Sequence, residues 1–314
     1  MAEAFGNAWS KAGRFDEAID WYTRARVAPD GTSSLAAVEQ LANLTVRRAW
    51  EQAARTDARD SAARERARKD IAEAMALLDM LLAVGPTSER ESLYGSAYKR
   101  LALIEAAAGP GRDDQELEAI AKMKVHYAAA EKIARLREAD EPRGDVNAFY
   151  PAMNWIAAQL ALEGGMQGVA APDAEALAAV RRSMMAAPPD FWSVVGQTEL
   201  NMYTALFAGA LEESLESLTE EFKTHHERVN APKRWATIHD NATFVLTKYK
   251  LRATPREVAA AEVLLETLSE LAGQRPTPAK TPATRQRAKT PRKRRSGRSK
   301  RTRPSKRRPT PSIS

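Results

Sequence analysis

Few side chains in this chain of 314 residues could form a catalytic or metal-binding site. There is no cysteine, which excludes disulfides, thiolate zinc sites and cysteine nucleophiles. His225 and His226 are adjacent and Glu227 follows them, a weak likeness to a zinc signature. Adjacent side chains on a helix point about 100° apart, so these two histidines cannot share a metal ion. We expect them on a solvated helix surface, and we expect no metal site and no cofactor.

The other two histidines also lack the surroundings of a catalytic base. A base needs a nucleophile to activate and a partner that orients it. His126 precedes Tyr127 in a helical pattern and His239 precedes Asp240, but neighbours in sequence do not define a site. The phosphate-loop patterns G-x-x-x-x-G-K-[ST] and G-x-G-x-x-G are missing, and so is the G-x-S-x-G nucleophile pattern. The sequence therefore predicts a protein that is not an enzyme.

The C-terminal segment 273–314 could bind anions through its charge. It holds 16 of the 48 Lys and Arg residues and no Asp or Glu. Residues 1–272 keep 32 basic and 41 acidic residues, so they carry a net charge of −9. The segment is rich in proline and poor in apolar side chains, which predicts a disordered tail. Its densest basic residues are Arg292, Lys293, Arg294, Arg295, Arg298, Lys300, Arg301, Arg303, Lys306, Arg307 and Arg308.

Three roles are open for this tail. Clusters of Lys and Arg bind nucleic-acid phosphates and release counterions, so such binding weakens steeply with salt. The tail has no aromatic side chain that could stack on bases, so sequence readout is not indicated. The tail could instead contact an acidic protein, including the acidic region 1–272, or act as a solubilising extension that binds nothing.

Residues 1–272 must supply the fold that positions any further site. Ala, Leu and Glu are frequent, apolar residues recur at i, i+3 and i+4, and no period-2 alternation persists. This pattern predicts about a dozen helices, mostly paired as antiparallel hairpins, with a seam near 163–173 where Gly and Pro gather. No apolar stretch approaches the ~18 residues of a membrane span, and the N-terminus lacks a secretory signal. We therefore expect a cytoplasmic protein.

Capping residues indicate where several helices begin. The S-x-x-E spacing at 88–91 predicts a capping box that starts on Ser88. The same spacing at 254–257, with Pro255 at the first helical position, predicts a helix that starts after Thr254. Further predicted N-caps are Asp173 and Asp190, and predicted turns lie at Gly13, Gly85 and Gly109.

The strongest motif is a helical hairpin at 6–30. Small and aromatic residues recur there at fixed offsets, at Gly6, Trp9, Gly13, Phe15, Ala18, Tyr22, Ala25 and Pro29. They resemble a tetratricopeptide repeat, in which small residues let two helices approach closely and aromatics fill the groove between hairpins. A looser copy continues through Ala74, Leu78, Leu81, Pro86, Gly95, Ala97, Tyr98, Met123, Tyr127 and Ala130. The resemblance implies an all-α solenoid of antiparallel hairpins over 1–272.

A second resemblance covers about residues 60–250. The Gly-x-x-Tyr-Lys core at Gly95, Tyr98 and Lys99 and the Tyr-Pro-x-x-Asn segment at Tyr150, Pro151 and Asn154 carry it. Together they are similar to the tetratricopeptide-type TRAF-binding region of MAP kinase kinase kinases and of bacterial effector-associated proteins. This resemblance implies a signalling scaffold or sensor arm, and it implies no chemistry.

These patterns lead to a functional hypothesis with one alternative. We expect a non-enzymatic protein–protein interaction scaffold whose concave groove binds a protein or peptide partner. The alternative is a nucleic-acid-associated protein tethered through its basic tail. The aromatics at helical spacing predict inter-helix core, with Trp21 as the best candidate for exposure. The solenoid pattern starts inside a helix at residue 1, so we also expect the chain to be part of a larger system.

Overall fold

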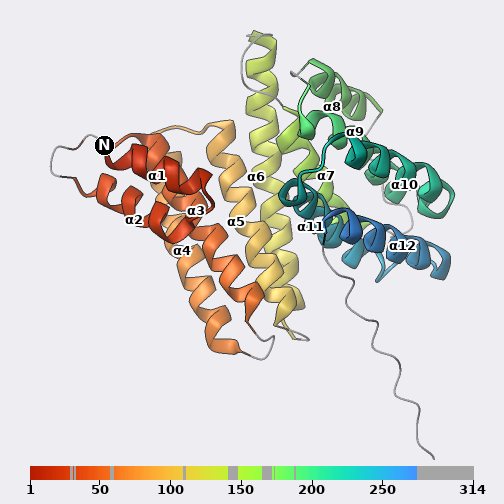
Figure 1. Cartoon of the computed structure of the whole chain (residues 1–314), viewed down its shortest axis with the longest axis horizontal. Coiled ribbons are helices and arrows are strands. Elements are labelled where there is room, and N and C mark those ends of the chain that lie inside the picture. Colours follow the sequence, from red (N-terminus) through yellow and green to blue (C-terminus); the bar gives the residue numbers. More distant parts are fainter. Residues whose placement is uncertain are drawn as a thin grey trace, which may run out of the picture. The chain divides into compact units, whose positions relative to one another are not determined.

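The protein is described by a computed structural model that covers residues 1–28, 31, 33–56, 60–108, 111–140, 148–164, 172, 174–186 and 189–273. Within these residues the chain forms twelve α-helices and no strand, which confirms the all-α prediction (Figure 1). Residues Met1–Pro276 make up one compact unit. None of the described helices is long and apolar enough to cross a membrane. Apart from Gly273, the predicted tail 273–314 lies outside the described residues, as do Pro29, Gly109, Asp173 and most of the predicted seam.

The first seven helices follow one another as packed neighbours. They are α1 (Ala2–Lys11), α2 (Phe15–Arg26), α3 (Leu35–Arg55), α4 (Ser61–Val84), α5 (Ser88–Ala107), α6 (Asp113–Asp140) and α7 (Phe149–Glu163). Each packs on the next, and α3 also packs directly on α5. If α1–α2, α3–α4 and α5–α6 are taken as hairpins, α1, α3 and α5 are their first helices. The direct contact of α3 with α5 therefore places two first helices side by side.

The last five helices do not continue this simple succession. They are α8 (Ala174–Ala186), α9 (Phe191–Ala208), α10 (Leu211–Arg228), α11 (Pro232–Tyr249) and α12 (Pro255–Leu271). Helix α7 packs on α8, α9 and α11, while α12 packs on both α10 and α11 (Figure 1). Helix α7 thus joins the row of hairpins to a second group of helices.

Several helices start where the sequence predicts. Asp190 caps α9 and forms a capping box with Ser193. The Thr254 hydroxyl accepts a hydrogen bond from the backbone N–H of Glu257, with Pro255 at the first helical position. These two helix starts are confirmed because the capping side chain bonds a backbone group only three residues away.

The capping box predicted on Ser88 is wrong. Thr87 is the N-cap of α5, since its backbone is extended and its hydroxyl accepts a bond from the N–H of Arg90. The helix therefore begins one residue earlier than predicted, and the third helical position falls on Arg90. Glu91 contacts His126 instead of the cap. The adjacent Thr and Ser offer equivalent hydroxyls, and the sequence pattern selected the wrong one.

The aromatic residues are mostly core, with one correction. Trp235 is fully buried and its ring lies edge-on to Phe191 and Phe222. Trp21 is only partly exposed because it stacks on Phe5 at 4.7 Å between ring centroids. Trp192 is 38% exposed, so Trp192 and not Trp21 is the more exposed tryptophan.

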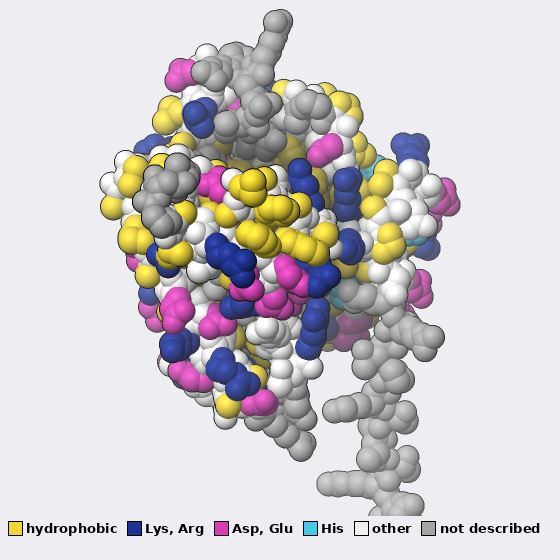
Figure 2. Space-filling view, turned by 60° about the vertical axis from the view of Figure 1, so that its left-hand side comes forward, with side chains coloured by type: hydrophobic (Ala, Val, Ile, Leu, Met, Phe, Trp, Pro, Cys, Tyr) yellow, Lys and Arg dark blue, Asp and Glu magenta, His cyan; other side chains and the backbone are white. Residues whose placement is uncertain are grey.

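Hydrophobic side chains also gather on the surface of the molecule. Figure 2, which brings the left-hand side of Figure 1 forward, shows such a group beside Lys, Arg, Asp and Glu side chains. Exposed large hydrophobic residues of the first three helices and their connections are Met1, Phe5, Val27 and Leu35.

Candidate binding site between α3, α5 and α7

Two glycine–tyrosine contacts set the spacing of the hairpins. Gly6 of α1 is buried against Tyr22 of α2, and a Cβ atom on Gly6 would lie 3.0 Å from the tyrosine ring. Gly95 of α5 meets Tyr127 of α6 in the same way, and a Cβ atom there would lie 2.7 Å from the ring. A missing side chain on the first helix thus accommodates an aromatic ring from the second helix.

The other residues of the first hairpin motif occupy core or boundary positions. Gly13 lies in the turn between α1 and α2 with φ +74°, a conformation that favours glycine. Trp9 and Phe15 are partly buried and pack against the core of the first helices. The buried alanines of this motif and its copy are Ala18, Ala25, Ala74, Ala97 and Ala130.

Two arginines on the neighbouring helices α3 and α5 form no ion pair with the described acidic residues. Arg100 of α5 donates to the backbone oxygen of Ser96 at 3.2 Å and also contacts the Ser96 hydroxyl. Arg47 of α3 lies over the ring of Phe15, 4.7 Å from its centroid. Among the described residues, neither guanidinium has a carboxylate oxygen within the 4.0 Å of an ion pair. Neither guanidinium is therefore directly neutralised by a carboxylate of the described residues.

The charge of Arg47 affects the pKa of Arg100. Burial lowers the pKa of Arg100, and repulsion from Arg47 acts in the same direction. Tyr127, Tyr150 and Glu51 act against that lowering of the pKa. Two like charges in a partly buried position disfavour each other, so a bound anion would relieve the repulsion.

Lys99 extends this basic region toward α11. Its ammonium donates to Asn241 at 2.5 Å and lies 5.3 Å from the ring centroid of Phe244. Asn241 in turn donates to Glu199 of α9 at 3.3 Å, and the Tyr203 hydroxyl donates to the same carboxylate at 2.7 Å. Burial lowers the pKa of Lys99 to about 8 and raises the pKa of Glu199.

Helix α7 contributes two residues of the Tyr-Pro-x-x-Asn segment. The Tyr150 side chain is 51% exposed and its ring lies edge-on to Tyr127 with centroids 6.5 Å apart. Asn154 donates its amide to the backbone oxygen of Tyr150 at 3.0 Å. Burial raises the pKa of Tyr150, and the charges of Arg100 and Arg47 act against that rise.

Tyr98 lies in a different group of side chains. It stacks with His126 at 5.5 Å between centroids, and Tyr94 stacks on the same histidine at 4.4 Å. The Glu91 carboxylate lies 2.7 Å from the Nδ1 atom of His126 and forms a hydrogen bond with it. Of the residues that carry the second resemblance, Lys99 and Tyr150 flank Arg100, whereas Tyr98 packs between α5 and α6.

The adjacent histidines are partly buried, which corrects the prediction that they lie on a solvated helix surface. The Nε2 atom of His225 lies 3.1 Å from the Thr198 hydroxyl of α9, and His226 packs against Trp235 with centroids 5.4 Å apart. Burial lowers the pKa of His225. Helix α10, which carries both histidines, packs on α9, and this contact covers part of the α10 surface. No group of three or more metal-binding side chains occurs within the described ranges.

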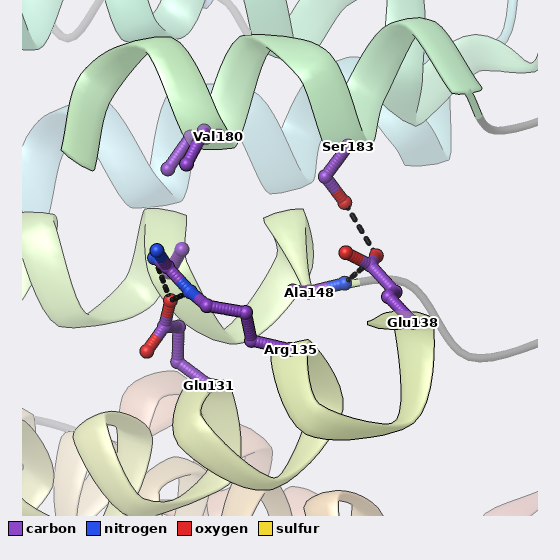
Figure 3. A pocket seen from close by; sticks show the side chains of 8 residues that line it. Glu131, Arg135, Glu138, Ala148, Val180 and Ser183 are labelled. Carbon is purple, nitrogen blue, oxygen red and sulfur yellow. Dashed lines mark hydrogen bonds and ion pairs between the residues drawn. The ribbon is translucent and has the colours of Figure 1, made fainter. Parts of the chain in front are cut away.

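One small cavity lies where α6, α7 and α8 meet (Figure 3). Its volume is about 30 Å³, enough for a water molecule or two and far below the ~300 Å³ of the smallest usual ligand pockets. In Figure 3 the Glu138 carboxylate reaches the Ser183 hydroxyl, at 2.6 Å, and the N–H of Ala148. Glu131 and Arg135 pair on the opposite wall. These side chains bond one another and tie the start of α7 to its neighbours.

Comparison with known families agrees with the hairpin geometry. Residues 14–161 match the family model described as Tetratricopeptide Repeats-Sensor. This part of the chain, which includes α2 to α6 and most of α7, is therefore similar to a tetratricopeptide-type domain, in agreement with the motif at 6–30. No curated protein and no solved structure matches the chain.

The sequence pattern gave no sign of the two arginines. Arg47 and Arg100 belong to no motif, and many other arginines share their helical context. The one available signal is position, because Arg100 directly follows Lys99 of the Gly-x-x-Tyr-Lys core. Their approach depends on the packing of α3 against α5, which no local pattern encodes.

Proposed function

We propose that this protein is a non-enzymatic protein–protein interaction scaffold that binds its partner along α3, α5 and α7. The observation that carries the proposal is the half-exposed ring of Tyr150, whose pKa responds to the charges of Arg47 and Arg100, two arginines that form no ion pair among the described residues. Arginines without an acidic partner on neighbouring first helices are suited to a partner segment that crosses them.

Two further considerations support a scaffold. The match of residues 14–161 is to a family described as a sensor, and tetratricopeptide-type domains generally mediate contacts between proteins. The cavity beside α7 is too small for an organic substrate. The finer role of a sensor or adaptor arm in a signalling system rests on the TRAF-binding resemblance.

A photo-cross-linking experiment tests this proposal. The photoreactive residue p-benzoylphenylalanine replaces Tyr150 in the full chain, or replaces Val125 of α6, which is 65% exposed, as the matched control. After irradiation in the native host, the Tyr150 probe should capture one protein that survives nuclease treatment and moderate salt, and the Val125 probe should not. Equal capture by both probes would contradict a binding face on α3, α5 and α7.

The sequence also favours a second function, tethering to nucleic acid through the segment 273–314. Its 16 basic residues and lack of acidic residues carry this alternative. A chain shortened to end at Leu271 separates the two functions. The scaffold proposal expects partner binding to persist without the tail, whereas the tether expects retention on DNA or RNA at low salt to disappear.

A further inference from the structure

We propose that the exposed face of α1 is a self-association surface that pairs with the same face of a second copy of this chain. The two copies of α1 lie antiparallel across a two-fold axis. The inference goes beyond the scaffold proposal and does not depend on it. It follows from a comparison of two hairpins, α1–α2 and α5–α6, because a preceding helix packs on the second hairpin but not on the first.

The two hairpins are held together by equivalent contacts. Both contain the glycine–tyrosine contact described above. In both, the residue before the glycine also stacks on the residue before the tyrosine. Phe5 stacks on Trp21 with ring centroids 4.7 Å apart, and Tyr94 stacks on His126 with centroids 4.4 Å apart. The two first helices can therefore be compared position by position, starting from their glycines.

In the second hairpin, the face of α5 around this aromatic residue is buried. Leu93, Tyr94 and Ala97 are at most 8% exposed and share a core with residues of α3 and α4. The Tyr94 hydroxyl donates to Asp79 of α4 at 2.7 Å. Only residues 85–87 connect α4 to α5, so the two helices run antiparallel. Within the chain itself, this face is thus covered by an antiparallel helix.

In the first hairpin, the equivalent face of α1 is exposed. Ala4, Phe5 and Ala8 occupy the positions that are buried on α5, and all three are exposed. Among the described helices, α2 is the main packing neighbour of α1. Figure 2 shows hydrophobic side chains gathered on the side of the molecule where Figure 1 places α1. Phenylalanine in place of tyrosine lacks the hydroxyl that donates to Asp79, so this face suits an apolar occupant.

The exposed residues of α1 are complementary to a second copy of themselves. Met1, Phe5, Ala8 and Ala12 are all exposed and follow one another at intervals of four, three and four residues, the spacing of a coiled-coil seam. When two copies of α1 lie antiparallel with their centres aligned, Phe5 of one copy faces Ala8 of the other, and Met1 faces Ala12. A large side chain meets a small one in each pair, which lets the two helices approach closely.

The charges of α1 also favour this arrangement. Glu3 lies in its first turn and Lys11 in its last turn. The Glu3 carboxylate is held by the backbone N–H of Ser34 at 2.6 Å and by the Ser34 hydroxyl at 2.9 Å, and a carboxylate can accept further bonds. Antiparallel pairing brings Glu3 of one copy near Lys11 of the other, and it also opposes the two helix dipoles. A second copy therefore supplies both the apolar surface and the opposite charges.

The first test measures self-association of the full-length protein. Sedimentation velocity between about 1 and 100 μM should show a dimer, since this range of dissociation constants suits a small interface. Ala8→Glu should raise the dissociation constant at least about tenfold, because it places a carboxylate in an apolar contact. Lys11→Glu should raise it about threefold. Val125→Glu, at a 65% exposed position of α6, is the matched control and should leave it unchanged.

A second test locates the surface. The photoreactive residue p-benzoylphenylalanine replaces Phe5 in a mixture of isotope-labelled and unlabelled chains. Cross-linked peptides that join a labelled to an unlabelled chain come only from two copies. The probe should reach residues 5–12 of the other copy, the segment around Ala8. The side chain of Ala8 is exposed, so circular dichroism should show that Ala8→Glu folds like the unchanged protein.

Three outcomes would overturn the assignment. A protein that stays monomeric over the whole range of concentrations has no such surface. A dimer that Ala8→Glu leaves intact, or cross-links from position 5 to other parts of the second copy, would place the dimer contact elsewhere. Cross-linking from position 5 in the native host to a different protein alone would assign the face to that protein. Capture of a partner by the probe at Tyr150 is a separate result, so the scaffold proposal stands or fails independently.

Discussion

Several helices of the hairpins up to α7 and of the region α8 to α12 differ in how their first backbone N–H groups are capped. In the first region, α3, α4 and α5 begin on Ser34, Asp60 and Thr87, whose own side chains accept a bond from the helix backbone. In the second region, α10 and α11 begin on Ala210 and Ala231, which have no capping side chain. The start of α10 is instead satisfied by a residue of α12, whereas α9 and α12 keep local caps on Asp190 and Thr254.

Glu257 shows how this works in the second region. Its carboxylate accepts bonds from the backbone N–H groups of Leu211 at 3.0 Å and Glu212 at 2.9 Å, and from the Tyr249 hydroxyl at 2.6 Å. A side chain of α12 therefore caps α10. Arg252 does the same for the end of α7, where it reaches the backbone oxygen of Ala161 at 3.3 Å. The starts of α3, α4 and α5 therefore depend on residues within three positions, whereas the start of α10 depends on α12.

The largest expected effect comes from a substitution in the shared core of the second region. Trp235→Ala should lower the free energy of unfolding by about 3–5 kcal/mol, because the ring is fully buried and its N–H bonds the Val229 oxygen at 2.8 Å. Urea denaturation followed by circular dichroism measures the change. A loss below ~1 kcal/mol would show that α10 and α11 do not share one core.

The second-largest expected loss of stability comes from removing Glu257, which caps α10. Glu257→Ala should cost about 3 kcal/mol, since it leaves the buried N–H of Leu211 and the Tyr249 hydroxyl without their partner. Hydrogen exchange should speed up at the start of α10 and not only in α12. Faster exchange confined to α12 would contradict a cap that acts across helices. Glu270→Ala, an exposed position at the end of α12, is the control.

The glycine–tyrosine contact is the corresponding test in the first region. Gly95→Ala should cost about 1–3 kcal/mol, because the added methyl would lie 2.7 Å from the Tyr127 ring. In a Tyr127→Ala background the same substitution should be neutral or stabilising, since alanine favours a helix more than glycine does. A double-mutant cycle measures the coupling, and additive effects would rule out the contact as the cause.

The pH dependence of stability tests the contact between the two regions at Lys99 of α5, which bonds Asn241 of α11. The pKa of Lys99 is about 8 in the folded protein and 10.5 for an ordinary lysine. Between these values the unfolded chain binds more protons than the native state, so this group makes the free energy of unfolding rise with pH. Lys99→Met should reduce that rise by at most about 1.4 kcal/mol per pH unit. Urea titrations between pH 7.5 and 9.5 measure it, and equal slopes would refute the shift.

The smallest effect concerns a single local cap. Thr87→Ala should cost about 1 kcal/mol because the hydroxyl that bonds the N–H of Arg90 is lost. Ser88→Ala is the matched substitution one residue later, and it should change stability by less than about 0.5 kcal/mol. Thermal unfolding of the two variants side by side checks the difference. A larger loss for Ser88→Ala would restore the capping box expected from the sequence pattern.

The sequence by itself determined the all-α class, the tetratricopeptide-type hairpins and the helix starts at Asp190 and Thr254. Each of these depends on periodicity or on contacts within three or four residues, which a local pattern contains. The choice between Thr87 and Ser88 shows the limit of such reasoning, because two equivalent caps in succession differ only in backbone conformation.

The tertiary structure alone decided where the uncompensated charge lies. Arg47 affects the pKa of Arg100 because α3 packs on α5, and Glu257 caps α10 because α12 packs beside it. The partners of a long charged side chain are set by helices that lie far apart in the sequence, so no spacing rule predicts them. For the same reason the sequence placed His225 and His226 on the solvated surface, whereas the packing of α10 on α9 partly buries them.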